Sequence, residues 1–593
     1  MIKKNSYLLL FIIFISCSAD NSSKKIIVED FSTLRDSSSG PIVGFQDHYD
    51  SITWLGIPYA EPPIGELRWR APVSKSKSNT TIKALTHSNI CFQNNGRIVK
   101  YDESNSDYIG SEDCLYLNIH APKNSSLTSN LPVMVWIHGG GNTTGSANVY
   151  DFSKLASQHN LIVVTINYRL GPLGWFYHPS LNKTGKSLED KSGNFGLLDQ
   201  IEALRWIKEN IKNFGGDSSN VTIFGESAGG HNVFSLISSP VAKGLFHRAI
   251  SQSGSTRSFS LSQASNYIDD ENSPGLPTSS KEAVNKFLVK KNQSKDRFEA
   301  KIMQDSMDDL MLANFLQSLK PEEIYEVYDE ATVAGMFRVP RIIADGYVLP
   351  LDGMNFKKNQ FNKVPTMLGT NRDEMKLFYS MDPDYVTRVL NILIFVKDKE
   401  KYEIENEYSS KNWKINGVDN PARRLIKSGN SEVYAYRFDW DEEPKYLWMD
   451  FSKIFGAAHG FEISFVSGIF RYFGFEDYII NNSNRDAARE LSNAMMSYWA
   501  EFAYSGNPAK GRDKNLVNWD AWNLDENTNK FIILDTIKDK GIRMTKSQLF
   551  HSDELKRLAA DDRIKDFATK CRYIVELKQS GNKSNFSMEG CEL

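Results

Sequence analysis

The pentapeptide Gly225-Glu226-Ser227-Ala228-Gly229 has the composition of a sharp turn that exposes a serine hydroxyl. It follows residues 221–224, a short apolar run typical of a buried strand, and a helix-compatible run comes after it. Glycines on both sides of Ser227 leave room for the turn, because a Cβ at those positions would collide with neighbouring backbone. This strand–turn–helix context is that of a nucleophile elbow, so we predict that Ser227 is a catalytic nucleophile.

A serine hydroxyl is a weak nucleophile and needs a general base. Behind such an elbow the acid and then the histidine follow the serine along the chain. Of ten histidines, only His459 and His551 lie far enough beyond Ser227. His551 stands among charged residues typical of a solvated surface, whereas His459 lies between small residues that let a loop place its ring near a substrate. We therefore predict that His459 is the base.

Two adjacent carboxylates, Asp373 and Glu374, follow a predicted strand at residues 366–371. The acid of a triad only accepts a hydrogen bond from the imidazole and stabilises its cation, so either residue type can serve. The residues alone do not choose between them.

A second glycine-rich turn, His138-Gly139-Gly140-Gly141, follows the apolar run at 133–137. Consecutive glycines allow backbone N–H groups to come close to an oxyanion, together with the N–H of the residue after the nucleophile. We predict an oxyanion hole made by Gly140, Gly141 and Ala228. The order of this loop and the elbow along the chain argues against a merely flexible loop.

Short apolar runs alternate with helical patterns such as residues 198–211, which predicts an α/β protein with a mostly parallel sheet flanked by helices. Residues from about 258 to 330 are charged and helical in pattern, so we expect a helical insertion over the sheet. Residues 491–504 predict an aromatic-rich amphipathic helix. The apolar runs are 133–137, 161–166 and 221–224, with shorter ones at 249–250, 367–368 and 433–436.

The composition of the chain excludes some classes of function. The chain has 593 residues, of which 40% are hydrophobic and 12% aromatic, and its net charge is −3. A large packed core follows from these values, and the lack of a basic excess argues against a nucleic-acid partner. The glycine loop has no following Lys-Ser/Thr, and no two His or Cys stand at ligand spacing, so we expect neither metal nor cofactor.

The start of the chain has the pattern of an export signal: Lys3 and Lys4, an apolar stretch at 7–15 too short to span a bilayer, then small residues. Cys17 resembles the lipidated cysteine of bacterial lipoproteins. We expect residues 1–16 to be a signal peptide, Cys17 the mature terminus, 17–25 a tether and 26–593 one catalytic domain. The membrane contact would then be a lipid anchor on an exported, cell-envelope protein.

Apart from Cys17, four of the five cysteines remain, which in an exported protein suggests two disulfides. Local pairing of Cys91 with Cys114 and of Cys571 with Cys591 is the simplest arrangement. Buried free thiols are the alternative.

Taken together, the motifs resemble the type B carboxylesterase and cholinesterase family of α/β-hydrolases over residues from about 40 to 530. The resemblance implies that fold, with the helical insertion over the active site. The motifs include Gly56-Ile57-Pro58-Tyr59-Ala60, Ser111-Glu112-Asp113-Cys114, Asn167-Tyr168-Arg169, Gly193-Asn194-Phe195-Gly196, Gln252-Ser253-Gly254 and His459-Gly460-Phe461-Glu462, besides the two glycine turns.

Carried over by position, the resemblance implies Ser227 as nucleophile, His459 as base and Glu374 as the acid, although Met375 replaces the glycine usual after that acid. It places Glu226 and Ser253 beside the triad. It also implies the disulfide between Cys91 and Cys114 and two ion pairs, Arg68 with Glu112 and Arg169 with Asp199.

The implied activity is hydrolysis of small uncharged carboxylic esters through an acyl-enzyme. The alternative is a non-catalytic adhesion protein on the same fold, but such relatives lose the nucleophile that this chain retains. No Trp lies between Cys91 and Cys114, which argues against cationic choline esters. Asn142 and Ser255-Thr256-Arg257 predict an acyl pocket that is more polar or wider than in relatives.

Overall fold

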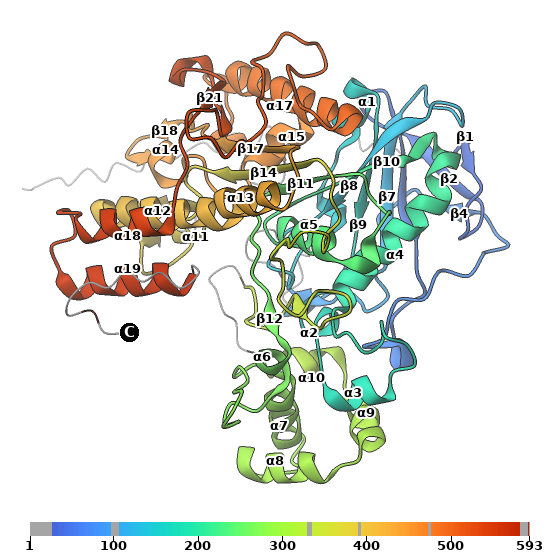
Figure 1. Ribbon diagram of the computed structural model, residues 1–593. Coiled ribbons are helices and arrows are strands. Elements are labelled where there is room, and N and C mark those ends of the chain that lie inside the picture. The colour runs from blue at the N-terminus through green and yellow to red at the C-terminus, as the bar shows by residue number, and fades with distance from the viewer. Residues whose placement is uncertain are drawn as a thin grey trace, which may run out of the picture.

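The computed structural model describes residues 27–95, 106–328, 335–389, 393–471, 476–580 and 591, so the expected signal peptide, Cys17 and the tether lie outside the described residues. A large mixed sheet runs through the protein, with helices on both of its faces (Figure 1). The strand order along it is β1-β2-β3-β7-β9-β8-β10-β11-β14-β17-β20-β21, and β4 pairs with β2.

The centre of the sheet, from β9 to β20, is parallel, as the alternating pattern predicted. Antiparallel strands extend it at the N-terminal side, and β21 extends it antiparallel at the other. The parallel strands are β9 (Ile162–Ile166), β8 (Leu131–Ile137), β10 (Gly216–Glu226), β11 (Arg248–Gln252), β14 (Thr366–Asn371), β17 (Val433–Phe438) and β20 (Phe531–Leu534). The others are β1 (Asp30–Arg35), β2 (Ile42–Gln46), β3 (Ser51–Pro58), β4 (Ile82–Lys83), β7 (Tyr116–Pro122) and β21 (Arg543–Thr545).

Strand β8 explains why the central runs are mostly apolar. Val133, Val135 and Ile137 belong to the hydrophobic cluster beneath α4 (Phe195–Asn210) and α5 (Ala228–Ser238). Met134 and Trp136 belong to the cluster on the opposite face, under α17 (Arg485–Ser505). Successive side chains of a strand point to opposite faces, and helices bury both faces here, so neither face of β8 is exposed to solvent.

The predicted helical insertion is present as five helices that project from the sheet (Figure 1). A short parallel pair, β12 (Phe259–Ser260) and β13 (Ile343–Ala344), joins its two ends. Ser279, Asp296 and Asp308 cap three of the helices by accepting a backbone N–H, which sets their starts. The helices are α6 (Leu261–Ser265), α7 (Ser280–Lys290), α8 (Arg297–Ser306), α9 (Asp309–Ser318) and α10 (Pro321–Tyr325).

A second helical layer was not predicted from the sequence. Helix α12 (Lys399–Lys414) continues through a π-helical turn at Ile415–Asp419 into α13 (Asn420–Lys427). The C-terminal helices α18 (His551–Ala559) and α19 (Phe567–Ser580) pack on α12 through a small apolar cluster that includes Tyr408, Leu558 and Ile574. His551 is half-buried here and its Nε2 lies 3.0 Å from Asn416 Oδ1, so it is not a solvated surface residue.

Shorter elements complete the described chain. No helix among the described residues is both long and apolar enough to cross a membrane. The remaining helices are α1 (Ser153–His159), α2 (Gly171–Gly174), α3 (Pro179–Thr184), α11 (Lys376–Tyr379), α14 (Phe451–Ile454), α15 (Glu462–Ser467) and α16 (Glu476–Ile479). The remaining strand pairs are β5 (Gln93–Asn94) with β6 (Tyr108–Ile109), β15 (Val386–Val389) with β16 (Leu393–Val396), and β18 (Lys445–Tyr446) with β19 (Met449–Asp450).

Two disulfides join Cys91 to Cys114 and Cys571 to Cys591, the local pairing that the sequence made simplest. Both ion pairs implied by the resemblance are also present. Arg68 and Glu112 form two hydrogen bonds of 2.6 Å each. Arg169 binds the buried carboxylate of Asp199 in the same bidentate manner, at 2.8 and 2.7 Å.

We expect Cys91→Ser to lower the free energy of unfolding of the oxidised protein by about 3 kcal/mol. The reason is that the Cys91–Cys114 bond closes a loop with a sequence separation of 23 and so restricts the unfolded chain. Thermal unfolding of the variant and the wild type, each with and without reductant, measures this. Equal melting temperatures for both oxidised proteins would contradict the prediction.

Candidate active site

Ser227 stands at the sharp turn between β10 and α5. Its backbone has φ 58° and ψ −119°, which L-residues adopt only under constraint, at a cost of about 1–3 kcal/mol. Two backbone hydrogen bonds hold the turn: Ser227 N–H donates to Gln252 O at 2.9 Å, and Ser227 O accepts from His231 N–H at 3.0 Å. The strain therefore fixes the direction of the Ser227 side chain.

The glycines of the elbow are required by contact with the end of β8. A Cβ on Gly229 would lie 1.9 Å from Ile137 O, and a Cβ on Gly225 would lie 2.6 Å from the same atom. Neither distance is possible without moving the strand. Only glycine at both positions lets the elbow pack against β8.

The glycine loop after β8 lies beside the elbow. A Cβ on Gly139 would come within 3.2 Å of Ser227 Cβ. Gly140 and Gly141 have φ of +96° and +63°, and the N–H groups of Thr143 and Thr144 close the turn on Gly140 O at 3.1 and 2.9 Å. The N–H groups of Gly140 and Gly141 donate to no described residue, so they are available to an oxyanion.

The contacts of the Asn142 side chain do not fit the expectation that it makes the acyl pocket polar. Its side chain is buried and forms a reciprocal amide pair with Asn232 of α5, at 3.1 and 2.9 Å. Its Oδ1 also accepts from Tyr168 OH at 3.2 Å. The amide thus fixes the glycine loop to α5 and presents no free polar atom to a substrate.

His459 lies in a loop before α15, and its buried ring contacts two carboxylates. Its Nδ1 lies 2.5 Å from Glu374 Oε2, and its Nε2 lies 3.1 Å from Glu226 Oε1. The aromatic rings of Trp413 and Phe378 lie against it, with centroid distances of 4.7 and 5.2 Å. The imidazole is therefore held on one edge by Glu374 and shielded from water on its faces.

Glu374 follows β14 and is fully buried. Three donors bind its Oε1: Ser253 Oγ at 2.7 Å, Thr370 Oγ1 at 2.6 Å and the Asn371 N–H at 2.7 Å. Oε2 is left for His459. A carboxylate held in this way fixes the orientation and the tautomer of the imidazole.

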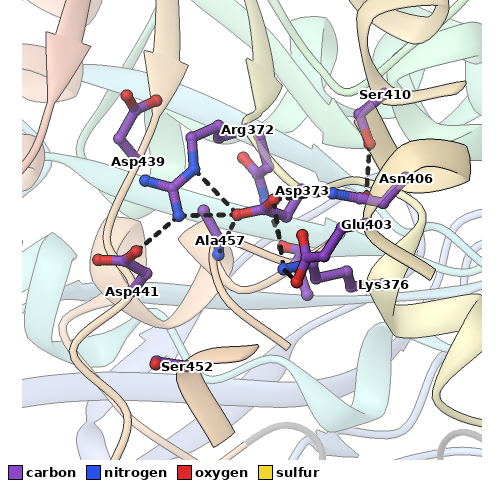
Figure 2. Close-up of polar contacts among 12 residues, drawn as sticks. Arg372, Asp373, Lys376, Glu403, Asn406, Ser410, Asp439, Asp441, Ser452 and Ala457 are labelled. Atoms are coloured by element: carbon purple, nitrogen blue, oxygen red, sulfur yellow. Dashed lines mark hydrogen bonds and ion pairs between the residues drawn. The ribbon is translucent and has the colours of Figure 1, made fainter. Parts of the chain in front are cut away.

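Asp373 points into a charged network that includes Arg372 and Lys376 (Figure 2). Its carboxylate accepts from Arg372 at 2.8 and 3.0 Å, from Asn406 Nδ2 at 2.8 Å and from the Ala457 N–H at 3.2 Å. Burial raises the pKa of Asp373, but the charges of Lys376 and Arg372 outweigh it and lower the pKa overall. Asp373 thus joins the end of β14 to α12 and to the loop that carries His459.

The electrostatics of the site are dominated by buried acids around one histidine. Burial alone lowers the pKa of His459, but the carboxylates of Glu226 and Glu374 reverse this and raise it to about 9. Burial raises the pKa of Glu226, while the nearby imidazolium opposes that rise. A third acid, Glu462, is also fully buried and accepts from Asn371 Nδ2 at 2.6 Å. The surroundings therefore favour the imidazolium form of His459.

Three residues around His459 were not predicted to act there. Glu462 stands three residues after His459, in a motif that the sequence analysis noted without assigning it a role. Trp413 comes from α12, where its indole N–H donates to Ser253 O at 2.9 Å. Phe378 comes from α11, which begins two residues after Glu374. No local pattern indicated that these two side chains reach the ring.

Known proteins resemble this chain over most of its length. The model of the carboxylesterase family matches residues 32–421 and 396–550. The chain belongs to the carboxylesterase family. This carboxylesterase is 34% identical over 499 residues to the para-nitrobenzyl esterase of Bacillus subtilis (strain 168), covering 82% of this chain and 91% of that protein. It is 31% identical over 533 residues to the human cocaine esterase, covering 84% and 87%.

Solved structures of relatives show the same α/β-hydrolase fold. A PNB esterase structure superposes on the carboxylesterase with a TM-score of 0.65 and 28% identity, covering 86% of this chain and 97% of the other. A Geobacillus stearothermophilus carboxylesterase at 26% identity gives a TM-score of 0.61 with the same coverage. The protein is thus an ester-hydrolysing enzyme of this fold.

A pair of variants can distinguish the roles of the two adjacent carboxylates, Asp373 and Glu374. We expect Glu374→Gln to lower kcat roughly 10⁴-fold, because the amide cannot stabilise the imidazolium. Asp373→Asn should retain most of kcat and instead lower the melting temperature, because it weakens a buried charge network. Steady-state kinetics and thermal unfolding of both variants measure this. A large loss of kcat in Asp373→Asn together with a nearly unchanged kcat in Glu374→Gln would reverse the assignment.

The charge of Glu226 should be visible in the pH dependence of activity. A base must be neutral to accept a proton, so activity rises as the pH passes upward through the pKa of His459. Glu226 raises that pKa. Glu226→Gln should therefore move the acidic limb of the kcat/KM profile to lower pH. Glu271→Gln, on the exposed insertion, is the control, and an acidic limb that stays in place or moves upward contradicts the prediction.

Proposed function

We propose that this carboxylesterase hydrolyses uncharged carboxylic esters through an acyl-enzyme, with Ser227 as nucleophile, His459 as base and Glu374 as acid. The observation that carries the proposal is the 2.5 Å contact between His459 Nδ1 and Glu374 Oε2, beside a strained serine elbow. This contact leaves Nε2 as the basic nitrogen.

In the first half of the reaction, Ser227 Oγ attacks the ester carbonyl carbon while His459 Nε2 takes the hydroxyl proton. The developing oxyanion accepts hydrogen bonds from the N–H groups of Gly140, Gly141 and Ala228. The tetrahedral intermediate then collapses. Its C–O bond breaks, and the imidazolium gives its proton to the leaving alcohol.

In the second half, His459 takes a proton from a water molecule, which attacks the acyl-enzyme. Collapse of this intermediate releases the carboxylic acid and returns the proton to Ser227. Glu374 stabilises the imidazolium in both halves, and Glu226 adds to this from the Nε2 side. Ser253 is a positioning residue, since it binds the Glu374 oxygen that does not face His459.

We also propose that the enzyme is exported, with residues 1–16 as the signal, a lipid on Cys17, 17–25 as tether and 26–593 as the catalytic domain. The two disulfides support an oxidising compartment, since cytosolic thiols are kept reduced. One relative is named for para-nitrobenzyl esters and another for cocaine, which supports a small-molecule ester as the substrate.

Ser227→Ala should fold normally and lose nearly all hydrolysis of p-nitrophenyl esters, because the covalent centre is gone. A fluorophosphonate probe should label the wild-type protein at Ser227. Ser306→Ala, which alters an exposed serine of the insertion, should remain active and labelled. Equal labelling of another residue, or turnover by the Ser227→Ala variant, would refute the assignment. Absence of both turnover and labelling in the wild type would favour a binding role.

A further inference from the structure

Two β-hairpins, β15–β16 and β18–β19, lie side by side on the surface of the protein. The Ile394 N–H of the first donates to Met449 Sδ of the second at 3.5 Å, and the rings of Phe395 and Trp448 stack with their centroids 5.9 Å apart. The two hairpins therefore form one surface, which we call the hairpin face. Its apolar side chains are Val389, Phe395, Leu447 and Trp448, which are 43, 38, 79 and 56% exposed.

The register of the first hairpin explains why its exposed side is apolar. Thr387 pairs with Phe395, and Val389 follows Thr387 by two residues. Side chains two residues apart lie on the same face of a strand, so Val389 and Phe395 share a face. Ile394 is buried on the opposite face. The hairpin thus buries one apolar face and presents a second one to solvent.

The turn of the second hairpin has unusual residues. β18 and β19 pair Tyr446 with Met449, which leaves Leu447 and Trp448 as a two-residue turn. Leu447 has φ 54°, a conformation for which such turns favour glycine, asparagine or aspartate. A leucine therefore occupies this position against its conformational preference, while most of its side chain remains in water. Departures of this kind from local preference are typical of functional surfaces, as are exposed apolar patches.

Basic side chains accompany the hairpin face. Residues 386–397 and 445–453 contain four basic residues and one acidic residue, a net charge of +3, whereas the whole chain carries −3. Arg388 and Lys397 donate to backbone carbonyls at 2.8 and 2.7 Å, and none of the four forms an ion pair with a carboxylate among the described side chains. The positive charge of the face is therefore not neutralised by those side chains. The four basic residues, all exposed, are Arg388, Lys397, Lys445 and Lys453.

We propose that the hairpin face binds an anionic lipid surface, with Leu447 and Trp448 entering the boundary between headgroups and acyl chains. Tryptophan favours this boundary, because its ring is apolar and its indole N–H is polar. Lysine and arginine close to an anionic leaflet add electrostatic attraction. A protein partner would need an acidic surface with a pocket shaped for the protruding side chains, whereas a lipid surface accepts them without a fitted pocket. The proposal does not depend on the ester hydrolysis proposed above.

The test measures how the purified full-length protein co-sediments with two kinds of vesicle, phosphatidylcholine alone and an equal mixture of phosphatidylcholine and phosphatidylglycerol. We expect the wild type to partition into the anionic vesicles roughly tenfold more strongly, and this preference to fall as salt is added. A lipid on Cys17 would bind both kinds of vesicle. The ratio of the two partition coefficients therefore reports the hairpin face rather than the anchor.

Leu447→Asn combined with Trp448→Gly removes the protruding side chains and introduces residues that the turn prefers. This variant should partition into the anionic vesicles roughly tenfold less, while its melting temperature stays equal or rises. Side chains that served only to stabilise the fold would give the opposite result, a lower melting temperature with unchanged partitioning. Lys445→Gln combined with Lys453→Gln should lower the ratio of the two partition coefficients roughly tenfold.

Phe298→Asn and Lys123→Gln are the matched controls, since Phe298 is an exposed aromatic residue of α8 and Lys123 is an exposed lysine after β7. Both should partition as the wild type does. Equal partitioning of the wild type into the two kinds of vesicle, or an equal loss in the controls, would overturn the proposal. A wild-type dimer that Leu447→Asn with Trp448→Gly dissociates would also overturn it, because the face would then bind a second copy of the chain.

Hydrolysis of a soluble p-nitrophenyl ester without vesicles should be the same in the wild type and in all these variants, because none of the substituted residues contacts the triad. A wild type that binds anionic vesicles but hydrolyses no ester would overturn the proposed function and leave the hairpin face supported.

Discussion

The backbone strain at Ser227 is the constraint on which the other parts of the site depend. It exists only because two glycines let the elbow press against the carbonyl end of β8. The same contact brings the glycine loop, which is the direct continuation of β8, against the serine. The serine and the backbone N–H groups of the glycine loop are thus aligned by a single packing contact between neighbouring parallel strands, and the hydrogen-bonded sheet supplies the free energy that maintains the strain.

The surroundings of His459 determine how easily its buried ring is protonated. A buried imidazole resists protonation, yet the proposed mechanism requires an imidazolium twice per turnover. Acids placed on both nitrogen edges of His459 oppose the desolvation, while aromatic rings on its faces keep water out. Three donors bind Oε1 of Glu374, the oxygen that does not contact the imidazole ring of His459. The orientation of the Glu374 carboxylate therefore does not depend on whether His459 is protonated. The site thereby combines a stabilised cation with little rearrangement.

Features that depend on interactions between neighbouring residues could be predicted from the sequence. The elbow, the glycine loop, the central parallel strands and the helices of the insertion all follow from neighbouring residues, and the chain order restricted the histidine to His459. Asp373 and Glu374 could not be separated by residue type, because the choice depends on which carboxylate faces the loop of His459. The place of Trp413 beside His459 depends on a contact between distant segments, which local patterns do not contain. The layer of α12, α18 and α19 was missed because its apolar contacts are few and its helices are highly charged.

The short pairing of β12 with β13 has a wider consequence for how this protein can vary. The two ladder positions bring the ends of the insertion together, so the helices between them form a closed excursion from the α/β core. The entropy of closing such an excursion grows only with the logarithm of its length. The loops between helices α6 to α10 can therefore change in length at small entropic cost, whereas the buried faces of these helices, which include Phe287, Leu316 and Tyr325, belong to the main hydrophobic cluster and are constrained by it. The part of the insertion that is free to diverge is thus its exposed surface and its connecting loops, while the faces that pack on the α/β core evolve together with that core.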